Sequence, residues 1–482
     1  MIFTELRFLL FFALAFCVHW ALRGLTARKL WLLACSWGFY CAWDWRFLGL
    51  ILASTAIDLV AGRRIAAATR GDDERARRRW LHLSLAVNLG LLGVFKYLGW
   101  FVDSAVALCG WLGIPASEST LSIVLPVGIS FYTFQTLSYT IDVYRGRIEP
   151  ARSALDLALF VAFFPQLVAG PIVRAADFLP QLTRPVRFAQ VDARACLVLF
   201  LTGWIKKDVV SDTVAELVVD PVFAAPQAFD AFANLLAILF ELVVLYCDFS
   251  GYSDMAIATA GLLGYQLCVN FDFPWFARNT VDFWRRWHIS LTTWMRDYVY
   301  RPLGGDGGGE ASAAARRAQL LLTRNVMLTM LAIGLWHGAA WTFVAFGALH
   351  GAGILAYRAW SRSALAKAIP QTSLTILAAV LLNVAFHAAV MPFFRASNVE
   401  SALGMLARVV TWDTSASGTL PTAWLAVWLS LVLAHALVSL DLWPRWWRRV
   451  PDWLFAPGYG TAFALALACG APLAAPFVYF QF

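Results

Sequence analysis

The chain has 482 residues, of which 60% are hydrophobic and only 14% are charged, and its mean hydropathy is +0.66. Soluble domains carry about 25% charged residues, so this composition excludes an ordinary soluble protein and indicates a bilayer as the solvent. The net charge of +8 does not indicate nucleic-acid binding, because the basic residues stand in short runs between apolar segments, as in the cytoplasmic loops of membrane proteins.

Apolar runs recur along the whole chain. A spanning helix needs about 20 apolar residues, so we expect roughly 10–13 crossings, with some of the shorter runs re-entrant or interfacial. The candidate runs are 5–22, 28–45, 46–61, 80–101, 119–140, 154–170, 192–206, 230–247, 252–268, 318–336, 338–358, 372–392, 421–440 and 460–480. They predict an all-α polytopic membrane protein in which residues 1–482 form one integral membrane domain.

Basic residues between these runs predict the orientation of the chain. Residues 63–79 hold seven Arg, and Lys206 and Lys207 stand where an apolar run closes. Because Lys and Arg collect in cytoplasmic loops, we place these segments on the cytoplasmic side of the membrane.

Residues 282–300 are too polar to span a bilayer. They read DFWRRWHISLTTWMRDYVY, in which Trp and Arg residues are mixed. The pattern predicts an amphipathic or re-entrant helix, and it implies a buried cavity if the segment dips inward. Arg285 and Arg286 are suited either to anionic lipid headgroups or to an anionic acyl donor.

Histidine is scarce, and two of the seven stand out. His337 lies between two long apolar runs, where an ionisable group is expensive and usually faces the interior of a helix bundle. His288 lies in the polar segment 282–300. From the residues alone, His337 is either a functional residue or a core histidine that bonds across helices, and His288 is equally well an interfacial side chain. The other five are interpreted as structural or interfacial: His19, His82, His350, His387 and His435.

Other polar residues give weaker signals. Asp248 and Asp254, in DFSGYSD, are suited to capping a helix, pairing with a basic side chain or lining a polar path. The chain has no HExxH, GxSxG or phosphate-binding glycine motif, and its Cys and His spacing matches no metal site. We therefore expect neither a metal nor a bound cofactor.

Six stretches in order, between about 121 and 405, resemble the membrane-bound O-acyltransferases, and within them the branch of bacterial alginate O-acetyltransferases. The first signature is DFSGYSDMAIATAGLLGYQL followed by NFDFPWFARNTVDFWRRWHISLTTWMRDYVYRPLGG, and the second is NVMLTMLAIGLWHGAAWTFVAFGALHG. The others are LPVGISFYTFQTLSYTIDVYRG, FFPQLVAGPIVR, LFLTGWIKKDVVSDTVA and MPFFRASNVESALGML.

The resemblance implies roles for both histidines. In the family the histidine of the WHG-type motif and that of the WRRWHIS-type motif are catalytic, and these correspond to His337 and His288. The chain departs from the pattern at Arg301, where an apolar residue is expected, and at Gly307–Gly309, which replaces a more basic turn. These departures affect a loop and leave both histidines intact.

The resemblance also implies a reaction. We expect His337 to act as general base on an acceptor hydroxyl, His288 to orient the donor or stabilise developing charge, and the indole of Trp336 or Trp341 to bind the oxyanion. An acyl-histidine intermediate stays open as an alternative. The expected donor is acetyl-CoA or another acyl thioester, and the acceptor is an exported polysaccharide, with alginate first.

The expected setting is the bacterial cytoplasmic (inner) membrane, with periplasmic acetyltransferase or polysaccharide-export proteins as partners. Three alternatives remain open. A related enzyme would act on another exopolysaccharide, on peptidoglycan or on teichoic acid. A glycan transporter would need no paired histidines and would often show inverted repeats. A scaffold subunit would tolerate the loss of both histidines.

Overall fold

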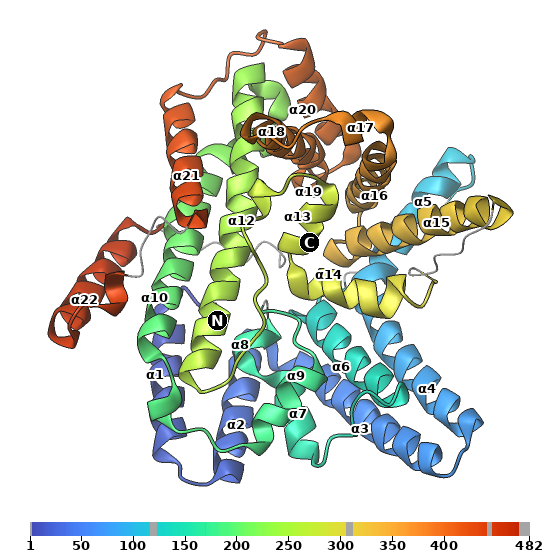
Figure 1. Ribbon diagram of the computed structural model, residues 1–482, viewed down its shortest axis with the longest axis vertical. Coiled ribbons are helices and arrows are strands. Elements are labelled where there is room, and N and C mark those ends of the chain that lie inside the picture. The colour runs from blue at the N-terminus through green and yellow to red at the C-terminus, as the bar shows by residue number, and fades with distance from the viewer. Residues whose placement is uncertain (1, 116–122, 169, 305–311, 441–445, 472–482) are drawn as a thin grey trace. The chain divides into compact units, whose positions relative to one another are not determined.

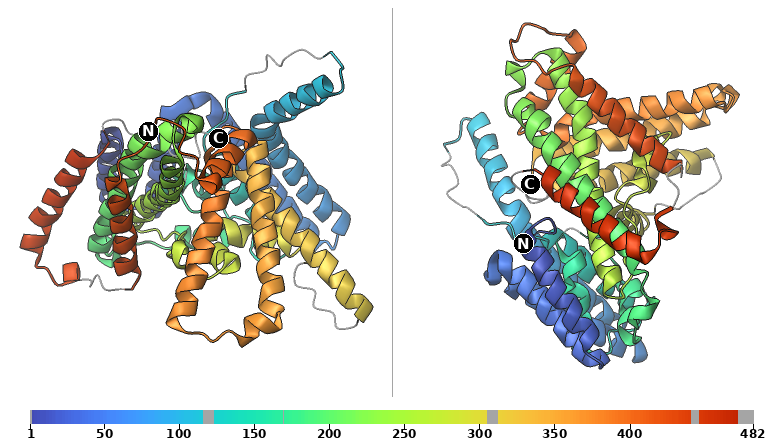
Figure 2. Two further views of the ribbon diagram at one scale, coloured as in Figure 1. Left: turned by 90° about the horizontal axis from the view of Figure 1, so that it is seen from above. Right: turned by 90° about the vertical axis from the view of Figure 1, so that its left-hand side faces the viewer.

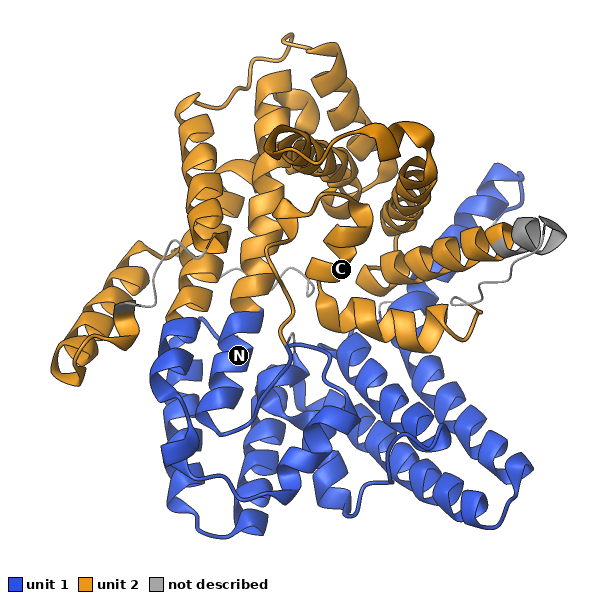
Figure 3. Ribbon diagram, in the orientation of Figure 1, with its two compact units in different colours: residues 1–200, 253–268 blue, residues 201–252, 269–482 orange. Residues whose placement is uncertain are grey.

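The fold was analysed in a computed structural model, which describes residues 2–115, 123–168, 170–304, 312–440 and 446–471. These residues form helices and no β-strand. They divide into two compact units, which are coloured separately in Figure 3. Unit 1 comprises residues 1–200 and 253–268, and unit 2 comprises residues 201–252 and 269–482. The sequence departure at Gly307–Gly309 lies outside the described residues.

Among the described residues, five segments are long and apolar enough to cross a membrane: Leu25–Arg70, Glu74–Trp111, Ala231–Leu262, Gln319–His337 and Ser373–Arg395. Two shorter apolar helices accompany them, Leu6–Ala21 and Ala423–Ser439. The predicted fold class, an all-α polytopic membrane protein, is confirmed. The total of roughly 10–13 crossings stays a prediction.

Unit 1 is built around a buried helix. Figure 1 shows α3, α4 and α6 side by side, and nearly every side chain of α6 is buried, including its polar ones. The helices of this unit are α1 (Leu6–Ala21), α2 (Leu25–Asp44), α3 (Leu48–Arg70), α4 (Glu74–Leu92), α5 (Leu98–Trp111), α6 (Ile129–Tyr144), α7 (Ala154–Ala162), α8 (Phe164–Leu167), α9 (Ala175–Phe178), most of α10 (Ala193–Trp204) and the end of α12 (Ala231–Leu262).

A buried carboxylate joins the three central helices of unit 1. Asp58 of α3 is fully buried and accepts hydrogen bonds from Ser84 and Asn88 of α4 and from Thr140 of α6. The Thr140 bond is 2.8 Å long. An apolar surrounding makes each unpaired polar group costly, so this network ties α3, α4 and α6 into one arrangement.

Unit 2 holds most of the remaining helices. They are the body of α12, α11 (Asp220–Ala224), α13 (Thr280–Arg286), α14 (Ile289–Met295), α15 (Ser312–His337), α16 (Trp341–Arg362), α17 (Ala364–Ala368), α18 (Ser373–Val390), α19 (Pro392–Arg395), α20 (Val399–Thr411), α21 (Ala423–Ser439) and α22 (Asp452–Cys469). Figure 2 shows α16 and α18 (orange) running beside each other on either side of the short α17.

Helices α15 and α16 approach closely through glycine. A Cβ added to Gly347 of α16 would lie 2.4 Å from the carbonyl oxygen of Met330 in α15. One added to Gly334 of α15 would lie 2.2 Å from the carbonyl oxygen of Phe343 in α16. Only glycine fits at such distances, so these two positions set how near the helices come.

Several expected boundaries are wrong. The runs 230–247 and 252–268 form one helix, α12, rather than two. The run 154–170 breaks at Phe163 into α7 and α8, and Pro165 stands in the first turn of α8. The basic stretch 63–79 is mostly helical, because α3 continues to Arg70 and α4 starts at Glu74. Hydropathy marked where the chain is apolar, which coincides neither with the ends of these helices nor with the breaks between them.

We predict that Asp58→Ala destabilises unit 1. Ser84, Asn88 and Thr140 would lose their shared acceptor, and leaving buried donors unpaired costs about 3 kcal/mol. The thermal unfolding midpoint of the purified protein in detergent should fall clearly below that of the wild type.

Asp103→Ala is the matched control, because Asp103 is an exposed carboxylate on α5 of the same unit. An Asp58→Ala midpoint no lower than that of the control would contradict a structural role for the network.

Candidate active site

The predicted helix 282–300 is broken in the structure. Helix α13 ends at Arg286, α14 begins at Ile289, and between them His288 adopts a left-handed backbone with φ of +42°. The strand-like stretch 270–272 holds this break in place. The Ile289 N–H donates to the Asn270 carbonyl oxygen and the Asp272 N–H donates to the Arg286 carbonyl oxygen, both at 2.9 Å. The break turns the His288 side chain into the protein, where it is fully buried.

A single amide oxygen fixes the protonation pattern of His288. The Oδ1 atom of Asn270 lies 3.0 Å from His288 Nδ1 and accepts hydrogen bonds from the Ser290 N–H and the Ser290 hydroxyl. A backbone N–H only donates, so this Asn270 atom is the oxygen, and Nδ1 of His288 must carry the proton. Burial lowers the pKa of His288 well below its ordinary value. The neutral ring therefore keeps its lone pair on Nε2.

His337 is the last residue of α15 and lies in an aromatic setting. It is 2% exposed, and its ring centroid lies 5.3 Å from Phe394 and 5.8 Å from Phe346. The Trp336 indole contacts both histidines, with centroids 5.1 Å from His337 and 5.3 Å from His288. Two motifs far apart in sequence thus converge on one buried tryptophan.

Two further histidines belong to the same cluster. His350 of α16 and His387 of α18 are almost fully buried, and their ring centroids lie 5.3 Å apart. Phe346 links them to His337, because it contacts both His337 and His350. His350 lies at the end of the family-like stretch NVMLTMLAIGLWHGAAWTFVAFGALHG, but the resemblance implies no role for it. His387 lies outside the six stretches, and its only local signal is a histidine within an apolar run, which many core histidines share.

Asp248 is part of a buried ion cluster. Lys207 Nζ lies 2.6 Å from Asp248 and 2.7 Å from Asp212, and no side chain of the three is more than 4% exposed. The sequence left three roles open for Asp248, and the structure shows one of them, pairing with a basic side chain. Lys207 does not lie in a loop between helices, because it is buried in a π-helix, Ile205–Asp212, that continues α10. Asp254, six residues further along α12, belongs to unit 1.

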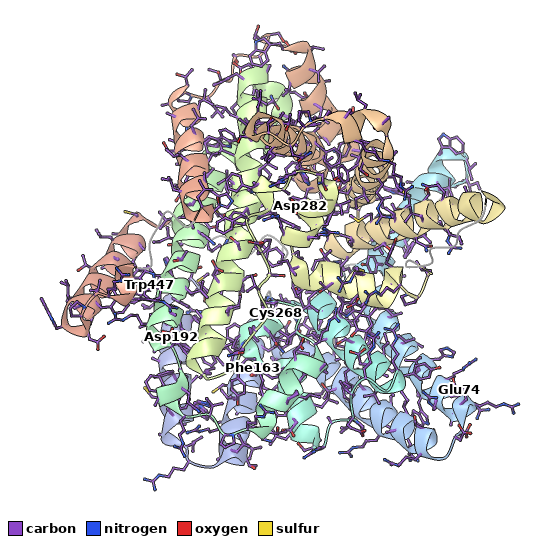
Figure 4. The ribbon with its side chains drawn as sticks, viewed as in Figure 1. Glu74, Phe163, Asp192, Cys268, Asp282 and Trp447 are labelled. Carbon is purple, nitrogen blue, oxygen red and sulfur yellow. The ribbon has the colours of Figure 1, made fainter. Side chains whose placement is uncertain are left out.

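The remaining predicted site residues are dispersed. Trp341, at the start of α16, is 59% exposed and so lies outside the buried cluster that contains Trp336. Arg286 pairs with Asp282 at 3.0 Å, and Figure 4 labels that aspartate. Arg285 is exposed and lines a cavity beside α13. Arg301, the departure from the family pattern, pairs with Asp297 at 2.9 Å.

Metal-ligating side chains do not gather in this part of the chain. Within residues that the structure describes, no group of three or more His, Cys, Asp or Glu side chains is placed to hold a metal ion. The four clustered histidines pack mainly on aromatic rings, which contribute no ligand atoms.

Comparison with known proteins finds relatives that are named as O-acetylases or O-acetyltransferases. The chain is 38% identical to the probable alginate O-acetylase of Azotobacter vinelandii over 445 residues, which covers 91% of this chain and 84% of that protein. It is 38% identical to the probable alginate O-acetylase of Pseudomonas aeruginosa, covering 86% of this chain and 76% of the relative. The peptidoglycan O-acetyltransferase of Helicobacter pylori is 33% identical, with 79% of this chain and 73% of the relative covered.

Residues 151–392 match the profile of the membrane-bound O-acyltransferases, and this range contains both predicted catalytic histidines and Trp336 between them. The match and the similarity over most of the chain agree with the resemblance drawn from the motifs. The chain belongs to the membrane-bound O-acyltransferase family.

Proposed function

We propose that this enzyme transfers an acetyl group from acetyl-CoA, or another cytosolic acyl thioester, to hydroxyl groups of an exported polysaccharide. Alginate is the first candidate, because the relatives in Azotobacter and Pseudomonas are named as probable alginate O-acetylases. The observation that carries the proposal is the convergence of His288 and His337 on Trp336. We place the enzyme in the bacterial inner membrane, where a cytosolic donor and an exported acceptor are both within reach, with periplasmic proteins as partners.

In this proposal His337 is the general base. It takes the proton of the acceptor hydroxyl as that oxygen attacks the thioester carbonyl carbon. The tetrahedral intermediate then collapses, the carbon–sulfur bond breaks, and the thiolate takes the proton from the His337 imidazolium. The N–H of the buried Trp336 indole is better placed than that of the exposed Trp341 to stabilise the oxyanion, since Trp336 contacts both histidines.

The hydrogen bond to Asn270 limits the roles that His288 can play in the reaction. With Nδ1 committed to Asn270, the neutral ring offers only the Nε2 lone pair, which accepts and cannot donate a hydrogen bond. Stabilising an oxyanion would require the imidazolium, which burial disfavours. We therefore assign His288 an orienting role, in which Nε2 accepts a hydrogen bond from a substrate. This replaces the broader pair of roles expected from the sequence.

Peptidoglycan is the second candidate acceptor. The Helicobacter relative is a peptidoglycan O-acetyltransferase, so acetylation of peptidoglycan is the main alternative for the same chemistry. The buried histidine cluster would serve either acceptor, because a sugar hydroxyl is the nucleophile in both. Acetyl esters should therefore be measured on the exported polysaccharide and on peptidoglycan from the same cells.

We predict that His337→Ala abolishes acetylation. Loss of a general base lowers the rate by about 10²- to 10⁴-fold, so acetyl ester content of the exported polysaccharide should fall to background. The measurement is ester content per sugar, with the membrane level of the protein determined in parallel.

His82→Ala is the matched control, because His82 is an exposed histidine on α4. Normal acetylation by His337→Ala at normal protein level would remove the catalytic assignment. It would favour a scaffold or transport role for the chain.

We predict that Asn270→Leu lowers activity about tenfold or more, because one hydrogen bond that orients His288 is lost, a cost of about 1.4 kcal/mol. Asn270→Asp keeps an acceptor oxygen and should retain more activity. Its carboxylate would raise the pKa of His288, since a negative charge stabilises the imidazolium.

The pH profile separates this role from a merely structural one. Activity that needs neutral His288 is lost as pH falls through its pKa, so the acidic limb should move to higher pH in Asn270→Asp. An acidic limb at the same pH as in the wild type would contradict the orienting role.

A further inference from the structure

A large cavity in unit 2 adjoins the histidine cluster on the side of Phe386, whose ring packs on His350 and His387. Its volume is about 1360 Å³, and it is bounded by α13, α16, α17 and α18. Neither His288 nor His337 lines it. Its size far exceeds what single water molecules need, so it has room for a ligand of tens of atoms or for the end of a longer one.

The walls of this cavity are mainly apolar. Leu349 of α16 and Ile376, Leu382 and Phe386 of α18 line it, together with several alanines. Helix α18 belongs to a candidate membrane span, and Leu377 and Leu381 on the same helix are largely exposed. A cavity beside a span that faces lipid is reached most directly by a molecule already in the bilayer.

One part of the lining is basic. Arg278, Arg285 and Arg286 all line the cavity, and they differ in their partners. Arg286 pairs with Asp282 and Asp272. Within the described part of the chain, Arg278 and Arg285 form no ion pair. Two guanidinium groups without a protein counter-ion beside an apolar cavity favour a ligand with an anionic group, and phosphate suits Arg best.

A polar side chain in the wall formed by α18 sets a second requirement on the ligand. Asn383 of α18 lines the cavity and is 96% buried, since only 4% of it is exposed. Neither its Nδ2 nor its Oδ1 atom has a hydrogen-bond partner among the described residues. A buried amide in this state costs free energy unless a ligand supplies partners. Ester carbonyl and glycerol hydroxyl groups provide an acceptor and a donor of the right kind.

We propose that this cavity binds one anionic phospholipid from the bilayer. The phosphodiester lies at Arg278 and Arg285, the glycerol and ester groups meet Asn383, and acyl chains run along α16 and α18. Basic pockets between spanning helices bind anionic headgroups by the same combination of charge and apolar walls. Neither the family profile nor the named relatives assign a lipid to this chain, and the inference does not depend on which acceptor the enzyme uses.

The bound lipid would also support the histidine cluster. Helix α13 carries Arg285 toward the cavity, while its Phe283 and Trp284 rings pack on His387 and His350, with centroids 3.8 and 5.1 Å apart. A lipid that holds α13 from one side therefore steadies the residues packed on the other. We expect acyl transfer to be faster in bilayers that contain an anionic phospholipid.

The test uses the full-length protein in phosphatidylcholine vesicles with and without phosphatidylglycerol. After mild extraction, native mass spectrometry counts the phosphatidylglycerol molecules that stay bound. The wild type should retain one more than Arg278→Gln/Arg285→Gln, whose affinity for this lipid should be about thirtyfold weaker with two charges removed. Arg362→Gln is the matched control, because Arg362 is an exposed arginine of α16 outside the cavity.

Ala356→Trp gives an independent test, because it fills the cavity and leaves both charges in place. It should also lose the retained lipid. Equal retention by the wild type and both cavity variants would overturn the proposal. Displacement of the lipid by acetyl-CoA would also overturn it, because the cavity would then be a donor site. Because the readout is binding, a failed acetylation assay would leave this result intact.

Discussion

The geometry of the site depends on one buried lysine. Lys207 lies beside the middle of α12, where an ammonium group without partners would be very costly, and it is held by Asp212 and Asp248. Five residues along an α-helix rotate by about 140°, which would point Lys207 and Asp212 apart. In the π-helix Ile205–Asp212 the backbone hydrogen bonds run from residue i to residue i+5 and the turn is wider, which brings the two side chains closer to one face. The irregular backbone is therefore what allows the pair to form.

The lysine acts on the site through α12. Gly251 on the next turn of this helix is so close to the α10 segment that an added Cβ would lie 2.6 Å from the Gly203 carbonyl oxygen. Phe249, beside Asp248 in sequence, packs edge-on against the His288 ring at 4.6 Å. The ion cluster and this close approach fix α12, and α12 supports one wall of the His288 pocket. The backbone also departs from α-helical geometry at His288, whose φ is positive, and there too polar groups must be satisfied inside the protein.

Hydropathy predicted the fold class and most helices, because a bilayer forces long apolar runs whatever the tertiary contacts are. It failed where polar residues are satisfied by distant partners. The polar residues of DFSGYSD separate two apolar runs, which predicts a boundary between two spans. Instead Lys207, 41 positions earlier, pairs with Asp248, and α12 continues through this stretch. The same pairing explains why Lys207 is buried inside the protein rather than exposed in a loop between spans. Neither error was avoidable without knowing which segments meet.

The candidate site was likewise predictable only in part from the sequence. Family motifs identified His288 and His337, but no motif predicted that Trp336 would contact both, since that depends on the break between α13 and α14. Asn270, which fixes the tautomer of His288, stands in the same family-like stretch, but no spacing rule predicts that a loop asparagine contacts a histidine 18 residues later. His350 and His387 are not predicted for a different reason: the resemblance implies no role for either, and only packing distinguishes each from an ordinary core residue.

The glycines around His337 have a physical explanation that the motif alone does not give. A Cβ added to Gly338 would lie 2.0 Å from the Phe343 ring, and the tight contact at Gly334 involves the backbone of the same residue. Both glycines therefore let the start of α16 fold back onto the end of α15. This brings Phe343 and Phe346 against His337 and excludes water from the imidazole. This proposed general base therefore stands in an aromatic pocket, which the acceptor hydroxyl must enter to give up its proton.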